Sequence, residues 1–177
     1  MSLQLPYETI KTLADFELRS YPGYVLAEVQ VRGDFITSGN SAFQPLLRYI
    51  TGLNDQKRQL QMTAPVLQTE AEPDHHLVSF VLPPGTTKVT APIPTDAQVQ
   101  IIDVEPHLAL ARKFSGGWSF DRFLDEAEKL EDSALGAIAA GEISGSIVGD
   151  PYFARYNSPF SLPFLRHNEV LVGFDSN

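Results

Sequence analysis

One stretch of this sequence recurs, in its apolar pattern, 83 positions further along the chain. FELRSYPGYVLAEVQVRGD occupies residues 16–34, and VQIIDVEPHLALARKFSGG occupies residues 99–117. Apolar positions match apolar positions along both copies, and Gly33 matches Gly116. Unrelated strands share such alternation, but a match at a constant offset favours an internal duplication. The sequence therefore predicts two similar units, each a β-α-β-β arrangement.

Short runs of alternating apolar and polar residues indicate the strands of these units. The chain has 13 prolines and 12 glycines, which separate the runs from one another. A period of two over four to eight residues is typical of a strand with one buried face. Segments 68–75 and 83–95 are expected to be loops. The expected strands cover residues 16–19, 25–31, 78–82, 99–101 and 170–174.

Two other segments have the period of an amphipathic helix. The first carries apolar residues at positions 43, 46, 47 and 50. Serines within Ser38–Ser41 are candidate caps, Pro45 is tolerated only near a first turn, and Gly52 suits the end. The second is expected from about Ser119 to Ala140, with Gly141 after it.

These elements predict an α+β fold. Two pseudo-symmetric β-α-β-β units, at about 7–85 and 96–175, would join their strands into one curved antiparallel sheet with both helices packed against it. The expected loops are too short to separate domains, so we expect residues 1–177 to form one domain. A cleft between a helix and the sheet is the natural ligand site of such an arrangement.

Composition excludes several classes of function. The chain has no cysteine, which rules out disulfides and thiolate chemistry. Its net charge of −9, without a basic cluster, argues against nucleic acid as a partner. No apolar run reaches the roughly 18 residues of a membrane helix, so no membrane association is expected. The first residues lack the pattern of a signal peptide, and we expect a cytoplasmic protein.

Residues that could carry chemistry are few, and the usual nucleotide, zinc-protease and hydrolase motifs do not occur. His75 and His76 fit a solvated loop better than a metal site. His107 and His167 are expected at the surface. Glu28 is either a buried carboxylate, which could act as a base, or an exposed edge residue. Aromatic residues near the C-terminus either line a pocket or cover the core: Tyr152, Phe153, Tyr156, Phe160 and Phe164.

Several motifs together resemble the SOUL family of heme-binding proteins, over nearly the whole chain and in the family's order. The combination of MTAPV after a helix end with a terminal NEV is specific. The motifs are FELRSYPGYVLAEV (16–29), LLRYITGLN (46–54), MTAPV (62–66), VSFVLP (78–83), PIPTD (92–96), FSG (114–116), YFARYNSP (152–159) and RHNEV (166–170).

The resemblance implies the same duplicated fold, built as a distorted antiparallel β-barrel with two helices, which effector-binding domains of bacterial regulators share. It also implies non-covalent binding of heme or a related tetrapyrrole, a small planar amphipathic ligand, beside the first helix. By position, the implied pocket residues are Asn40, Phe43, Leu47 and Arg48. Arg48 would pair with a propionate, for which a guanidinium is well suited.

Three positions depart from the family's pattern. Ser20 stands where one branch has a proposed axial histidine, and serine is not a useful iron ligand. Leu162 and Asn40 stand where basic residues are found. We therefore expect a bound heme to be held weakly or without histidine ligation, with no separate protein metal site.

Three functions follow, in order of preference. The first is a heme or tetrapyrrole carrier or buffer, which is not an enzyme. The second is an effector-type binding module for another amphipathic molecule. The third is a small-molecule hydrolase that uses a pocket carboxylate such as Glu28. The sequence does not identify a protein partner.

Overall fold

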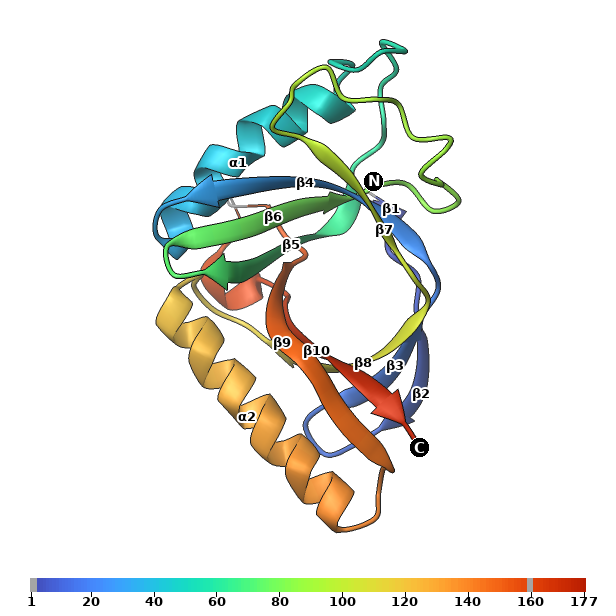
Figure 1. Cartoon of the computed structure of the whole chain (residues 1–177). Coiled ribbons are helices and arrows are strands. Elements are labelled where there is room, and N and C mark those ends of the chain that lie inside the picture. Colours follow the sequence, from blue (N-terminus) through green and yellow to red (C-terminus); the bar gives the residue numbers. More distant parts are fainter. Residues whose placement is uncertain (1–2, 159–160) are drawn as a thin grey trace. The chain divides into compact units, whose positions relative to one another are not determined.

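The computed structural model describes residues 3–158 and 161–177, and Phe160 lies outside these ranges. The chain divides into two compact units (Figure 1). Unit 1 comprises the N-terminal residues up to Pro6 together with Gly23–Glu105, and unit 2 comprises Tyr7–Pro22 and Pro106–Asn177.

Unit 1 contains helix α1 and a sheet with the strand order β1-β5-β6-β4-β7. Its strands pair antiparallel, apart from the short parallel pair of β1 with β5. The elements are β1 (Leu3–Gln4), β4 (Tyr24–Arg32), α1 (Phe35–Ile50), β5 (Thr63–Glu72), β6 (His75–Val81) and β7 (Gln100–Val104).

Unit 2 repeats this plan with helix α2 and the strand order β9-β10-β8-β3-β2, in which every pair is antiparallel. A short 3-10 turn, η1 (Pro163–Leu165), precedes the last strand. The other elements are β2 (Glu8–Thr12), β3 (Glu17–Tyr21), β8 (His107–Phe114), α2 (Phe120–Ala139), β9 (Gly145–Arg155) and β10 (Asn168–Ser176).

The strand register reproduces the sequence repeat. In unit 2, Leu18 of β3 pairs with Leu110 of β8. In unit 1, the residues 83 positions away, Ile101 of β7 and Ala27 of β4, pair in the same way. The predicted α+β class, the antiparallel strands and the two helices are thus confirmed for the described residues.

The repeated units are not simply consecutive halves of the chain. Strand β3 pairs within unit 2 although β4, which follows it, belongs to unit 1. In the described residues no strand pairing within either unit joins its strands into a closed ring, so hydrogen bonds there do not form a barrel. The barrel, the single domain and the boundaries 7–85 and 96–175 stay predictions.

Helix α1 begins earlier than predicted. Asp34 is its N-cap and accepts hydrogen bonds from the backbone N–H groups of Ile36 (3.0 Å) and Thr37 (2.9 Å). These bonds lower the pKa of Asp34, because they stabilise its charged form. The predicted start within 38–41 was wrong, and Pro45 lies well inside the helix rather than in its first turn.

The structure contradicts one further sequence prediction and agrees with another. The predicted loop at 68–75 is wrong, since β5 continues to Glu72 and a tight turn at Pro73 and Asp74 leads into β6. The second helix agrees closely with its prediction. Ser119 caps it by accepting a hydrogen bond from the N–H of Arg122 at 3.1 Å.

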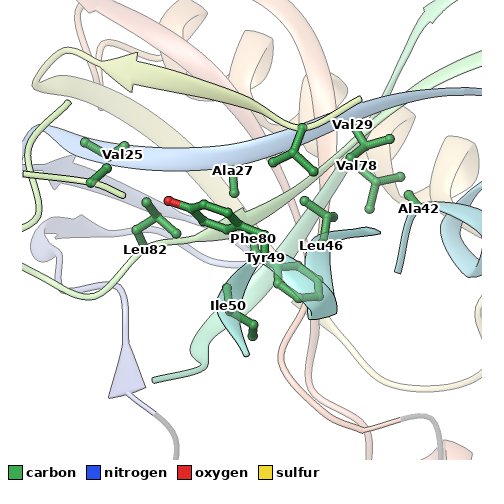
Figure 2. Packing of buried hydrophobic residues seen from close by; sticks show 12 residues of the cluster. Val25, Ala27, Val29, Ala42, Leu46, Tyr49, Ile50, Val78, Phe80 and Leu82 are labelled. Atoms are coloured by element: carbon green, nitrogen blue, oxygen red, sulfur yellow. The ribbon is translucent and has the colours of Figure 1, made fainter. Parts of the chain in front are cut away.

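The core of unit 1 lies between α1 and one face of the sheet (Figure 2). Every second residue of β4 points into it, as expected for a strand with a helix on one side. The buried cluster consists of Val25, Ala27, Val29, Ala42, Leu46, Tyr49, Ile50, Val78, Phe80, Leu82, Ala91 and Val99.

Candidate functional site

Helix α1 has one face fixed in the core. Leu46 and Ile50 are buried, as the sequence predicted, and Tyr49 lies between them in the same cluster. The Tyr49 hydroxyl donates a hydrogen bond of 2.8 Å to the carbonyl oxygen of Pro92. Burial raises the pKa of Tyr49 to about 12, so this hydroxyl stays protonated at neutral pH. The rotation of the helix is therefore determined, and so is the side that it presents outward.

A second apolar stripe lies beside the buried face. Residues of an α-helix follow one another at about 100°, so Ile36, Asn40, Phe43 and Leu47 fall within an arc of about 60°. Phe43 is 38% exposed and Ile36 is 41% exposed, while Leu47 is partly buried against the core. We call these four residues the outer stripe. It leaves two large apolar side chains open next to a well-packed face.

The ring of Phe43 packs against a buried aromatic ring. Its ring meets the ring of Phe80, a fully buried residue of β6, at a centroid distance of 5.4 Å and an angle of 69°. Edge-to-face contacts of this kind hold an aromatic ring in a defined orientation. The outer surface of Phe43 is thus a preorganised apolar face.

Arg48 is exposed and lies on the flank of the outer stripe, about 80° beyond Asn40 around the helix. It is the basic residue of the last helical turn, where the helix dipole favours a positive charge. Its long side chain can reach towards the stripe from this flank. The helix therefore brings Asn40, Phe43 and Leu47 together and sets Arg48 at their side.

Ile36 was missed by the sequence prediction because the helix was expected to begin after it. The correct cap, Asp34, was the signal that could have included it, since aspartate is among the best N-cap residues.

The outer stripe contains no histidine. His76 is buried rather than solvated, and its ring meets Phe35 edge-on at 5.9 Å on the buried side of α1. His107 stacks on Tyr21, and His167 stacks on Tyr156, in unit 2. Within the described ranges no three metal-ligating side chains come together.

A buried ion pair is the most prominent polar feature of unit 2. Arg19 donates two hydrogen bonds to Glu169, of 2.7 Å and 2.9 Å, and both side chains are fully buried. Glu169 also contacts His167 at 2.8 Å and accepts from the Tyr156 hydroxyl at 3.1 Å. Burial opposes ionisation, but the bonds from His167 and Arg19 outweigh it and lower the pKa of Glu169. This carboxylate is saturated with donors, so we interpret it as a structural anchor.

Glu28 has a different environment. It lies on β4, which is paired on both sides by β6 and β7, so it is not on an edge strand. It is partly buried, and burial raises its pKa even though Ser79 donates a hydrogen bond of 3.0 Å. Of the two interpretations of Glu28, a buried carboxylate agrees better with the structure than an exposed edge residue.

Comparison with known proteins identifies the family of this chain. The model of the SOUL heme-binding protein family matches residues 3–173. The chain belongs to the SOUL family. Two relatives named heme-binding protein 1 support this: that of Xenopus tropicalis is 28% identical and that of Xenopus laevis 27% identical over 161 residues. Each alignment covers 88% of this chain and 81% of the relative. SOUL proteins are binding proteins in general, and the family name indicates heme as the ligand class.

Solved structures of low identity share the fold of this SOUL protein. The EcmrR C-terminal domain aligns with a TM-score of 0.64 at 8% identity, over 94% of this chain and all of that one. A hydrolase from Listeria innocua aligns with a TM-score of 0.59 at 10% identity, over 94% of both chains. At these identities the likeness concerns the fold alone.

Neither helix in the described residues combines the length and the apolar character that crossing a bilayer would need.

Proposed function

We propose that the outer stripe of α1 binds one face of a heme or related tetrapyrrole without a covalent bond, and that the protein acts as a carrier or buffer. Phe43, held at an angle on Phe80 and still 38% exposed, is the observation that carries this proposal. A flat macrocycle can cover Phe43 and Leu47 together, because the two lie one helical turn apart within one narrow arc. Membership of a family named for heme binding supplies the class of ligand.

Arg48 and Asn40 provide the polar side of the proposed site. A porphyrin carries propionates at one edge, and Arg48 is suited to pair with one of them. Asn40 can donate to the same group or to its partner. A ring bound in this way is held by its apolar face and its acidic edge, while the bound heme itself would supply the iron centre.

In the proposed complex no histidine of the protein coordinates the heme iron. In unit 1, His76 contacts Phe35 on the buried side of α1. This supports binding that depends on the porphyrin rather than on its metal.

Titration with hemin and with iron-free protoporphyrin tests the proposal. Hemin binding changes the Soret absorbance, and both ligands should quench Trp118, the single tryptophan. Phe43→Ala should weaken both ligands about fivefold, because re-covering the exposed part of one phenylalanine is worth about 1 kcal/mol.

The matched control is Leu135→Ala on α2, which removes a side chain of 57% exposure from an equivalent exposed helix surface. It should leave both affinities unchanged. Equal losses in the two variants would contradict the proposed site. No Soret change at all would favour an effector-type module for another amphipathic ligand.

A further inference from the structure

Two loops of unit 1 are joined to each other by hydrogen bonds (Figure 1). Residues 51–62 follow α1, and residues 82–99 connect β6 to β7. The backbone N–H of Asp55 donates to the carbonyl oxygen of Ile93 at 2.9 Å, and the N–H of Ile93 donates to the Asp55 carboxylate at 2.7 Å. Arg58 also donates to the carbonyl oxygen of Thr90 at 3.3 Å. The two loops therefore hold each other in place, and we call them the paired loops.

The paired loops expose large aliphatic side chains. Val89 is 92% exposed, Ile93 is 66% exposed and Leu53 is 45% exposed. Val89 lies in a tight turn over residues 87–91, which a backbone hydrogen bond of 2.9 Å closes. This bond fixes the turn from which Val89 projects. Exposed apolar side chains that gather in one place, with charged residues around them, mark an interaction surface.

The same loops carry an excess of positive charge, although the chain as a whole has a net charge of −9. Arg48, in the last turn of α1, adds a further positive charge just before them. In residues 3–158 and 161–177 no ion pair includes any of the basic side chains at this end of unit 1. Their charge is therefore available to a partner. The charged residues of the paired loops are three basic and two acidic: Lys57, Arg58, Lys88, Asp55 and Asp96.

This combination of features favours one kind of partner. A symmetric contact with a second copy of the chain would bring Lys57 and Lys88 against like charges. Nucleic acid offers no apolar interior for Val89, and the paired loops contain no aromatic residue on which a base could stack. The interface of an anionic bilayer takes up single protruding aliphatic side chains without a matching pocket, and it attracts basic residues around them.

We propose that the paired loops are a docking surface for an anionic lipid bilayer. Val89 and Ile93 would enter the headgroup region, while Lys57, Arg58 and Lys88 would lie against the lipid phosphates. Binding of this kind takes place at the membrane surface and needs no spanning helix. The acidic remainder of the chain opposes it only weakly, since charges are screened over about 8 Å at physiological ionic strength. The surface contains no residue of the outer stripe, so the proposal does not depend on tetrapyrrole binding.

Co-sedimentation of the full chain with lipid vesicles tests the charge requirement. Vesicles that contain phosphatidylserine besides phosphatidylcholine should bind the chain at least about thirtyfold more tightly than vesicles of phosphatidylcholine alone, at about 0.15 M ionic strength. Substituting Lys57→Gln and Lys88→Gln together should weaken the binding about thirtyfold, because each lysine at an anionic surface contributes about fivefold. The control is Lys113→Gln on β8, which removes the charge of another exposed lysine and should change nothing.

The apolar contribution has its own pair of variants. Val89→Ser should weaken binding to the mixed vesicles at least about tenfold, because a side chain that leaves water on binding is lost. Leu135→Ser on α2 removes an exposed side chain of similar character and should leave the binding unchanged. Val89 and Leu135 are both exposed, so neither substitution disturbs the core.

The orientation on the membrane can be measured because the chain contains no cysteine. Val89→Cys, labelled with an environment-sensitive nitrobenzoxadiazole dye, should gain fluorescence and shift to shorter wavelength on the mixed vesicles, whereas labelled Leu135→Cys should not. Equal binding to both kinds of vesicle, unchanged binding of the double lysine variant, or equal dye responses at the two positions would each overturn the proposal. Self-association of the chain that masks the Val89 dye without lipid would also overturn it.

Discussion

The buried pair of Arg19 and Glu169 allows a quantitative prediction about stability. In Glu169→Gln the guanidinium of Arg19 stays fully buried while its bidentate partner loses its charge. Breaking a buried pair in this way costs about 3–5 kcal/mol. Glu17, which is 22% exposed, still contacts the Arg19 Nε at 2.7 Å, so we expect the lower end of this range.

A loss of about 3 kcal/mol corresponds to a fall in Tm of about 6–12 °C for a chain of this size. Thermal unfolding followed by circular dichroism measures it, with Asp125→Asn as the control, because that substitution breaks an exposed ion pair on α2. The control should leave the Tm unchanged. A shift in Glu169→Gln as small as that in the control would refute the assignment of Glu169 as an anchor.

The same pair predicts how stability depends on pH. The pKa of Glu169 is lower in the folded protein than in the unfolded chain, so the unfolded chain takes up protons first as the pH falls. The contribution of Glu169 is therefore complete above its ordinary pKa and is lost as the pH falls towards the lowered value. The difference in stability between the wild type and Glu169→Gln should shrink over this acidic range.

Other predictions concern individual side chains. Glu28→Gln should raise the Tm at pH 7, because the folded protein raises the pKa of Glu28 and so disfavours its charged form. The gain should vanish below the ordinary pKa of glutamate, where the wild type is also neutral, and a lower Tm of the variant at pH 7 would contradict the raised pKa. Arg48→Ala should weaken the binding of hemin and of iron-free protoporphyrin equally, by about two- to fivefold, because an exposed ion pair is worth at most about 1 kcal/mol. A preference for hemin above about a hundredfold, measured by absorbance, would instead indicate that the protein ligates the iron. Ser119→Ala removes the cap of α2 and should cost about 1 kcal/mol in urea unfolding, whereas an unchanged midpoint would mean that water replaces the cap.

Local patterns in the sequence predicted much of the fold. Alternation located β3, β4, β6 and β10, since each has one face against apolar neighbours. The constant offset of the repeat predicted two similar units, and the structure adds that β3 pairs with β8 in the same register as β7 with β4. Ser119 and Gly141 marked the ends of α2 because no competing signals lie nearby.

The errors arose where local signals compete. Several serines follow Asp34, so the true cap of α1 was passed over, and Ile36 was lost from the candidate site with it. Strand β5 was not among the predicted strands, and its second half, Gln68–Glu72, is mostly polar and was interpreted as a loop. Arg19 and Glu169 lie 150 positions apart, and no local pattern indicates that they meet.

The central claim concerns where a tetrapyrrole binds. Hemin is paramagnetic and broadens amide signals near it, whereas zinc protoporphyrin of the same shape does not. When each ligand is added separately to the ¹⁵N-labelled protein, the account predicts hemin-specific loss of signal centred on Ile36, Asn40, Phe43 and Leu47. Broadening centred on α2, or spread evenly over the chain, would contradict a site on the outer stripe of α1.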